Sequence, residues 1–158
     1  MKIRRASPAD VEVIHELIRD LAIYERAEGE VDVSLDEIAQ SFFGAEPRVF
    51  CDLVEDDTSV VGFAVWFLNY STWTGHYGIY LEDLYVRPES RGRGFGKALL
   101  AALAQECVNN GYTRLQWSAL NWNTPSIDFY TALGAEAMSE WTLYRLSGGP
   151  LEQLAASR

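Results

Sequence analysis

Residues 91–96, Arg-Gly-Arg-Gly-Phe-Gly, are the clearest chemical signal in the sequence, because they lie between an expected strand and an expected helix. Glycines let the backbone approach a ligand closely, N–H groups at a helix N-terminus bind anions, and two arginines add positive charge. The segment therefore predicts a phosphate or pyrophosphate site. It lacks the Gly-Lys-Ser/Thr of a Walker A loop and the register of a Rossmann fingerprint. An exposed flexible loop is the alternative, and the adjoining helix favours anion binding.

Two adjacent carboxylates, Glu82 and Asp83, interrupt an otherwise apolar strand. Neighbouring side chains of a strand point to opposite faces, and a buried carboxylate costs free energy unless it has a partner. At least one of the two is therefore expected to have a function or a fixed partner. Glu82, on the face expected for Leu84 and Val86, is the candidate to bind a substrate ammonium group and help remove its proton, directly or through water. The alternatives are a solvated edge strand and a structural salt bridge, and they stay more open for Asp83.

The cysteines and histidines offer no other chemistry. Cys51 and Cys107 lie in apolar segments without CxxC or Cys/His spacing, so we expect two small core residues rather than a disulfide framework or a zinc site. His15 and His76 have no metal-ligand spacing and no persuasive Ser/His/Asp order, and both are expected at the surface. The sequence therefore predicts no metal site.

Two motifs at the right separation resemble those of the GNAT superfamily of N-acetyltransferases. Arg91, Gly94 and Gly96 match its acetyl-CoA-binding pattern Arg-x-x-Gly-x-Gly, after a strand that ends Leu-Tyr-Val and before an amphipathic helix. Residues 123–130, Asn-Thr-Pro-Ser-Ile-Asp-Phe-Tyr, resemble the second motif. Together with residues 21–25 and 81–86, they resemble the diamine acetyltransferases, the spermidine/spermine and thialysine group. The similarity runs from about residue 3 to residue 146.

The resemblance implies acetyl-CoA as the acetyl donor, without a metal. Seven residues would hold its pyrophosphate: Arg91, Gly92, Arg93, Gly94, Phe95, Gly96 and Lys97. Backbone groups of Leu84, Tyr85 and Val86 would contact the pantetheine arm and thioester, and Asn123 and Ser126 would contact the far end of the pantetheine. Tyr130 would lie near the sulfur, where a phenol of pKa near ~10 can protonate the departing thiolate. Without the motif around it, Tyr130 would be read as a buried aromatic residue.

On the acceptor side, the resemblance implies carboxylates that face a polyamine chain. The residues concerned are Tyr24 and the carboxylates Glu25, Glu28, Glu30 and Glu140, and Glu82 and Asp83 from the strand above complete the expected amine site. By composition alone, the acidic run over residues 24–33 is typical of a solvated face. Ile23 and Asn121 stand where relatives have charged residues, which leaves the particular amine open.

The function that the resemblance implies is transfer of an acetyl group to a primary amine of a small di- or polyamine or aminoalkyl amino acid. The amine would attack the thioester directly in a ternary complex, without a covalent acyl-enzyme, and relatives imply a homodimer. The alternatives are a protein or peptide N-acetyltransferase, which would need an open groove, and a non-catalytic acetyl-CoA-binding module.

The pattern along the chain predicts that these residues are positioned by elements in the order β-α-α-β-β-β-α-β-α-β-β. This order predicts one α/β (α+β) domain over residues 1–146, and the resemblance implies that it has the GNAT fold. This is a mixed, mostly antiparallel sheet flanked by helices. Ser7-Pro8 and the capping box Ser34-x-x-Glu37 mark two helix starts. The expected helices cover residues 8–24, 35–43, 97–110 and 124–133. The expected strands cover residues 2–6, 49–55, 60–70, 77–86 and 115–120, with a tight turn at 56–58 and a final hairpin to Leu146. Residues 147–158 are expected to form a loosely ordered tail.

The charge balance excludes some partners. The chain has 158 residues, of which 13 are Lys or Arg and 23 are Asp or Glu, for a net charge of −10. Such a surface repels phosphate backbones and anionic lipid and suits a cationic partner, although negative charge also aids solubility. The longest apolar stretch, around residues 60–68, is too short to span a bilayer, and the N-terminus has no apolar signal region. We therefore expect a cytoplasmic protein with no nucleic-acid or membrane partner.

Overall fold

The computed structural model describes residues 1–57 and 59–157 and divides the chain into two compact units, residues 1–118 and 119–158. Thr58 of the expected turn at residues 56–58 lies outside the described residues. Among the described residues, no helix is long and apolar enough to cross a membrane.

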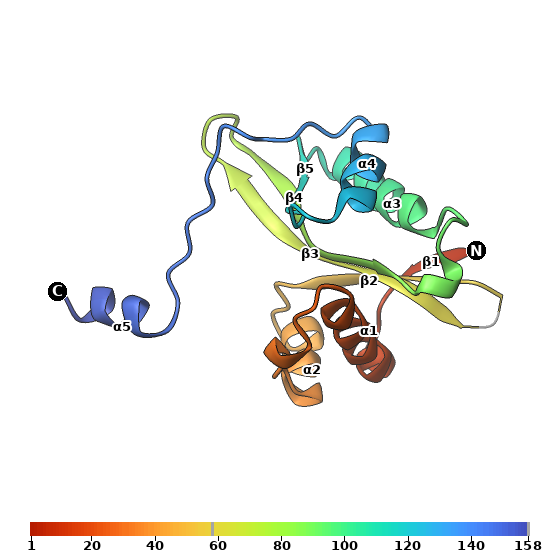
Figure 1. The fold of residues 1–158 in the computed structure, drawn as a ribbon, viewed down its shortest axis with the longest axis horizontal. Coiled ribbons are helices and arrows are strands. Elements are labelled where there is room, and N and C mark those ends of the chain that lie inside the picture. The colour runs from red at the N-terminus through yellow and green to blue at the C-terminus, as the bar shows by residue number, and fades with distance from the viewer. Residues whose placement is uncertain (58, 158) are drawn as a thin grey trace. The chain divides into compact units, whose positions relative to one another are not determined.

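The first unit is built on a sheet whose strands follow their order in the chain (Figure 1). The strands are β1 (Lys2–Arg5), β2 (Phe50–Glu55), β3 (Val60–Ser71), β4 (His76–Val86) and β5 (Leu115–Trp117). Neighbouring strands are antiparallel except for β4 and β5, which are parallel. The expected mixed, mostly antiparallel sheet is confirmed, and β5 ends three residues earlier than predicted, at Trp117.

Local capping groups start two of the helices as the sequence predicts. A 3-10 turn over Pro8–Asp10 leads into α1 (Val11–Tyr24), and α2 covers Leu35–Phe43. The Ser34 hydroxyl accepts a hydrogen bond from the Glu37 N–H at 3.2 Å, and the Glu37 carboxylate accepts from the Ser34 N–H at 2.8 Å. This reciprocal pair satisfies two backbone donors that the helix itself leaves unpaired.

The hydrophobic core lies between the sheet and these helices. Figure 1 shows α1 and α2 on one side of the sheet and α3 (Phe95–Asn110) on the other. On the α1 side, Ile14, Leu17 and Ile38 pack with Phe63 and Val65, which are two residues apart in β3 and so share a face. On the α3 side, the buried stripe includes Leu99, Leu100, Leu103 and Cys107. The sheet is therefore covered by helices on both faces.

The second unit differs from the expectation. It contains α4 (Thr124–Ala132) and α5 (Gly148–Ala156), and within the described residues it forms no final hairpin, so that prediction is wrong. The alternation of apolar residues in 135–146 is typical of a strand, but a strand forms only with a neighbour to pair with, and no ladder of this structure includes these residues. Their large apolar side chains stay exposed, Tyr144 at 88%. Helix α5 occupies the segment expected to be a loose tail, and all its residues are exposed.

We predict that Phe63→Ala lowers the free energy of unfolding by about 3–5 kcal/mol, because Phe63 is fully buried and truncation leaves a cavity between the sheet and α1. Chemical denaturation would measure the loss. Trp73→Ala is the matched control, since Trp73 is 88% exposed and its loss should change stability by less than about 0.5 kcal/mol. Equal losses in the two variants would contradict this placement of the core.

Candidate functional site

A β-bulge in β4 sets the geometry of the acidic pair. Asp83 lies opposite Val65 of β3 and Leu81 lies opposite Trp66, so Glu82 is an extra residue without a partner position on β3. Asp83 therefore shares the α1 face of the sheet with Val65 and Tyr85. The simple alternation assumed from the sequence is therefore interrupted between Leu81 and Asp83, and beyond the bulge Asp83 and Tyr85 share one face while Leu84 and Val86 share the other.

Of the two adjacent carboxylates, Asp83 is the one that the fold removes from solvent. It is half-buried, whereas Glu82 is exposed. Burial raises the pKa of Asp83 to about 6, and the negative charges of Glu82 and Glu25 add to the shift. Glu25, the residue that follows α1, is half-buried as well, and burial raises its pKa. We call Glu25, Glu82 and Asp83 the acidic cluster. A carboxyl group that titrates near neutral pH can both attract a cation and accept a proton from it.

The outer edge of β4 is open beside this cluster. Strand β5 pairs only with Ile79, Tyr80 and Leu81, so residues 82–86 of β4 continue past the end of that ladder. The Arg87 N–H donates to the Val61 carbonyl at 2.9 Å, and backbone groups alternate between the two edges of a strand. The backbone of Tyr85 therefore faces β3, and Leu84 and Val86 direct theirs to the open edge, where the Leu84 groups and the Val86 N–H can pair with amide groups of a ligand and the Val86 carbonyl accepts from Arg91.

The glycine-rich loop that follows β4 has the backbone of an anion site. Gly92 and Gly94 have φ of 73° and 86°, in the left-handed region that favours glycine. Gly94 is the N-cap of α3, so the N–H groups of Phe95, Gly96 and Lys97 begin the helix and have no intrahelical acceptor. Left-handed turns and a helix N-terminus together form a concave set of donors with a favourable dipole. This geometry fits a pyrophosphate.

The two arginines of the loop lie differently. The Arg91 Nε donates to the Val86 carbonyl at 2.8 Å, and its guanidinium lies 4.6 Å from the ring centre of Tyr24 and 5.4 Å from that of Tyr85. Arg93 is exposed, with Nη1 3.7 Å from an Asp56 carboxylate oxygen and the guanidinium 5.0 Å from the Phe95 ring centre. Arg93 is thus directed to solvent at the anion loop, and Arg91 is folded back onto α1 and β4.

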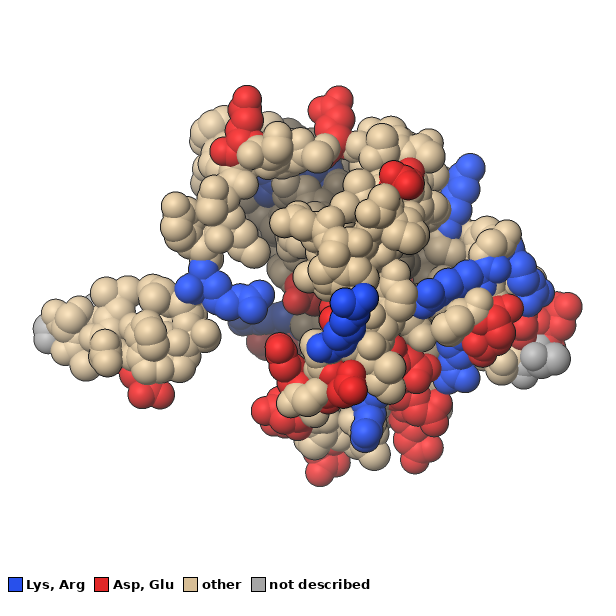
Figure 2. Space-filling view, viewed as in Figure 1, with Lys and Arg blue, Asp and Glu red and all other residues tan. Residues whose placement is uncertain are grey.

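Charge is unevenly distributed over the first unit. Figure 2 shows acidic side chains gathered in the part of the view where Figure 1 places α1 and α2. Glu28 and Glu30 belong to this exposed surface, on a 3-10 turn after α1.

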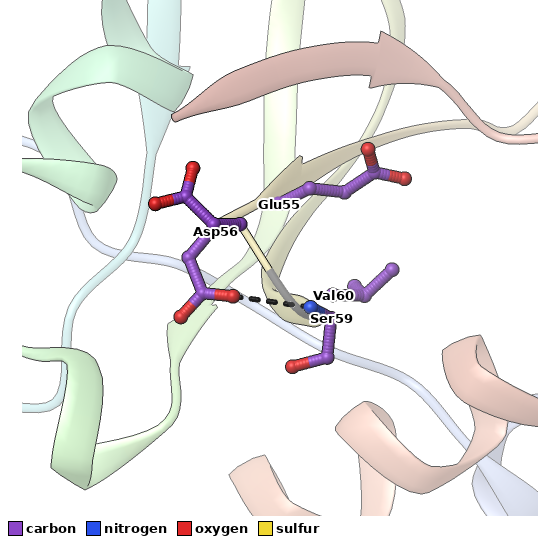
Figure 3. A pocket seen from close by; sticks show the side chains of 5 residues that line it. Glu55, Asp56, Ser59 and Val60 are labelled. Carbon is purple, nitrogen blue, oxygen red and sulfur yellow. Dashed lines mark hydrogen bonds between the residues drawn. The ribbon is translucent and has the colours of Figure 1, made fainter.

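A polar pocket also lies at the turn between β2 and β3. Its lining residues are Glu55, Asp56, Asp57, Ser59 and Val60 (Figure 3). The Asp56 carboxylate accepts a hydrogen bond from the Ser59 N–H at 3.1 Å, so it caps its own turn as well as facing Arg93. None of the predicted site residues lines this pocket.

The second unit holds the remaining candidates. Asn123 is buried and caps α4, where its side-chain oxygen accepts from the Ser126 N–H at 3.4 Å. Tyr130 lies half-buried near the C-terminal end of the same helix, its ring 5.3 Å from that of Phe129. Glu140 is exposed beyond the helix. The cap and the helix therefore bring Asn123, Ser126 and Tyr130 together in one element.

Arg87 was missed by sequence reasoning. It follows β4 directly, and its guanidinium lies 3.2 Å from Glu16 and 3.7 Å from Asp20, both on α1. These ion pairs tie the start of the anion loop to the helix that precedes Glu25. Glu16 and Asp20 are one helical turn apart on α1, and this spacing in the sequence indicates that both can bind the same cation. Only the fold shows that this cation is Arg87.

The chain is similar to known acetyltransferases in sequence. Residues 11–135 match the family model described as the acetyltransferase (GNAT) family. The thialysine N-epsilon-acetyltransferase of Bos taurus is 35% identical over 97% of this chain and 96% of its own length. The L-ornithine N5-acetyltransferase of Arabidopsis thaliana is 31% identical over 97% of this chain and 87% of its own. An integron cassette protein from the mobile metagenome of V. cholerae matches in structure with a TM-score of 0.83 and 25% identity, covering 99% of this chain and 98% of the other.

We predict that Asp83→Asn stabilises the protein at neutral pH. The folded pKa of about 6 lies above the ordinary 3.8, so the native state holds this proton more tightly than the unfolded state. The aspartate therefore costs no stability below about pH 4, an increasing amount between pH 4 and 6, and up to about 3 kcal/mol above pH 6.

Denaturation of both proteins from pH 3.5 to 7.5 would measure this difference. Glu28→Gln is the control, because Glu28 is exposed and its loss should leave the stability difference close to zero at every pH. A difference for Asp83→Asn that does not grow between pH 4 and 6 would contradict the assigned environment.

Proposed function

Because the chain belongs to the acetyltransferase (GNAT) family and is an acyltransferase, we propose that it transfers the acetyl group of acetyl-CoA to a primary amine of a small di- or polyamine or aminoalkyl amino acid. The observation that supports this most directly is the acidic cluster beside the open edge of β4. The anion loop follows the end of the same strand. A cationic acceptor suits the first site, and a phosphate-bearing donor suits the second.

The residues of the donor side fit acetyl-CoA. The loop over residues 91–97 offers backbone N–H groups and Arg93 for the pyrophosphate, and Leu84 and Val86 offer backbone groups for the amides of the pantetheine arm. In the second unit, Asn123 and Ser126 are the proposed contacts to the far end of the pantetheine. When bound, acetyl-CoA supplies a thioester carbon that an uncharged amine can attack.

The acceptor side prepares that amine. The acidic cluster attracts the ammonium group, with Tyr24 beside it and Glu140 as a further proposed contact from the second unit. Asp83, whose pKa lies near 6, is a stronger base than an ordinary aspartate and can take the ammonium proton, directly or through water. Glu82 is exposed beside Asp83 and is proposed to bind the same ammonium and to share this role.

Direct attack in a ternary complex is the proposed route, because the cysteines are unsuited to form an acyl-enzyme. Cys51 and Cys107 are both buried, and burial raises the pKa of each thiol. The thiolate is the nucleophilic form, so both stay unreactive near neutral pH. The departing CoA thiolate then needs a proton, which we assign to the Tyr130 phenol.

We also propose that the protein acts as a homodimer in the cytoplasm, without nucleic-acid or membrane partners. The net charge of −10 supports the exclusion of anionic partners. Exposed apolar side chains in residues 135–146, including Met138, Trp141, Leu143 and Tyr144, provide a surface that self-association would bury.

We predict that the protein acetylates small amines. Thiol release from acetyl-CoA would be followed with diamines, polyamines, thialysine and ornithine, and with a peptide that offers an N-terminal amine and a lysine as the contrasting acceptor. Turnover with small amines and little with the peptide is expected. Turnover with the peptide alone would favour the macromolecular acceptor, and tight acetyl-CoA binding without transfer to any amine would favour a non-catalytic module.

We predict that Tyr130→Phe lowers kcat by about 100-fold and leaves the Kd for acetyl-CoA within about 2-fold, because only the proton donor is removed. Calorimetry and steady-state kinetics would separate the two effects. Tyr144→Phe, at an exposed position of the same unit, is the matched control and should behave as the wild type. An equal loss of binding and turnover in Tyr130→Phe would refute the acid role.

A further inference from the structure

The turn between β2 and β3 reaches the anion loop through one ion pair. An Asp56 carboxylate oxygen lies 3.7 Å from Nη1 of Arg93, although the two residues are far apart in the sequence. The side chain of Asp56 is 19% exposed and that of Arg93 is 56% exposed. The arginine assigned above to the pyrophosphate of the donor therefore has a partner of opposite charge within the protein itself.

The Asp56 carboxylate is fixed by its own turn. Its Oδ1 accepts a hydrogen bond from the Ser59 N–H at 3.1 Å (Figure 3), and the Asp56 N–H donates to the Ser59 carbonyl at 3.1 Å. The other oxygen, Oδ2, is the one that faces Arg93. A carboxylate held through one oxygen loses little further side-chain entropy when the other makes a contact. Asp56 is therefore a preorganised partner for a cation on the anion loop.

The position of Arg93 depends on its side-chain contacts. Arg93 lies between Gly92 and Gly94, where an added Cβ would meet no atom within 4 Å beyond the adjoining residues. The backbone on both sides of Arg93 is therefore uncrowded. Its guanidinium lies 5.0 Å from the ring centre of Phe95, which is buried at the start of α3. The ring gives the guanidinium a fixed surface, and Asp56 supplies the charge toward which it is directed.

A carboxylate and a phosphate bind a guanidinium in the same way. Both present anionic oxygens to the same planar set of N–H groups. The contact of 3.7 Å between Asp56 and Arg93 is longer than a charge-assisted hydrogen bond, which is about 2.7–2.9 Å. Ion pairs that include an exposed arginine contribute little free energy, so a phosphate can take the guanidinium from Asp56. The gain from the phosphate contact is then reduced by the loss of the contact with Asp56.

We propose that Asp56 competes with a phosphate group of the donor for Arg93 and thereby weakens donor binding. The proposal rests on the proposed function, because it takes the anion loop as the phosphate site of acetyl-CoA. The product CoA carries the same phosphate groups as acetyl-CoA, so Asp56 lowers the affinity for both by the same factor. Asp56 therefore favours release of the product, although it makes no contact with the reacting groups.

The test measures the Kd of acetyl-CoA by calorimetry in matched variants. Asp56→Asn keeps an oxygen that can accept from the Ser59 N–H and loses the charge that faces Arg93, so it should lower the Kd about 2- to 5-fold. Asp57→Asn is the control, because it removes the same charge from the next residue of the turn, which is exposed. Its Kd should stay within about 1.5-fold of the wild type, since solvent and salt screen an exposed charge.

A double-mutant cycle tests whether Asp56 acts through Arg93. When Arg93→Gln is already present, adding Asp56→Asn should change the Kd by less than about 1.5-fold, because the group for which Asp56 competes is gone. Raising the salt concentration should also reduce the ratio of Kd values between the wild type and Asp56→Asn, since screening weakens the ion pair. A merely structural role of Asp56 would show neither dependence.

A comparison of CoA with 3′-dephospho-CoA identifies the phosphate. An equal effect of Asp56→Asn on both ligands supports competition with the pyrophosphate. An effect confined to CoA supports competition with the 3′-phosphate.

Three results would overturn the proposal. The first is an unchanged or raised Kd in Asp56→Asn, and the second is an equal decrease in Asp57→Asn, which would indicate net charge alone. The third is an effect of Asp56→Asn that persists with Arg93→Gln, because the carboxylate would then act on the phosphate directly.

Failure of the proposed function would look different. The wild type would then bind acetyl-CoA and transfer its acetyl group to no amine, and the comparison of Kd values would still decide the role of Asp56. A wild type that does not bind acetyl-CoA would refute both proposals.

Discussion

The structure of the site depends on one irregularity, the β-bulge at Glu82. Before the bulge, β4 is paired on both edges, with β3 and with β5; after it, the ladder with β5 has ended and only β3 continues. A bulge bends a strand and increases its local twist, which separates it from a neighbour that does not follow. The same residue also shifts the side-chain register, so Asp83 turns toward α1. The open backbone edge and the half-buried carboxylate are therefore consequences of one inserted residue.

The half-buried carboxylates Asp83 and Glu25 destabilise the native state when they are ionised, because burial raises the pKa of each. Burial and two neighbouring negative charges act on Asp83 in the same direction. Elsewhere in the first unit, buried carboxylates have direct cationic or N–H partners. Arg4 holds Asp10 at 2.7 Å and lowers its pKa, and Asp52 accepts a hydrogen bond from the Trp66 indole at 2.8 Å while Arg5 lies 3.1 Å away. Unpaired charge of one sign concentrated at a single place is typical of a binding site rather than of a structural ion pair.

Local signals in the sequence predicted much of the fold. The capping box at Ser34, the mostly antiparallel sheet and the helix that follows the glycine-rich loop depend on residues close together in the chain, and all are present in the structure. The final hairpin was predicted from alternation alone, and alternation does not supply a partner strand. The site was predicted as a set of residues, but its internal order was not. The bulge depends on pairing between β3 and β4, and the environment of Asp83 depends on the packing of α1.

In the proposed reaction, the electrostatics of the acceptor site follow from packing as much as from charge. An aspartate of ordinary pKa binds an ammonium group well but is a poor base toward it near neutral pH. Burial under α1, with Glu25 nearby, makes Asp83 a better base at a cost in stability that the bound cation offsets. The position of Glu25 depends on how α1 ends, and α1 ends against the guanidinium of Arg91, in the donor loop. The end of α1, which precedes Glu25, is therefore held by a contact with the glycine-rich loop that follows β4.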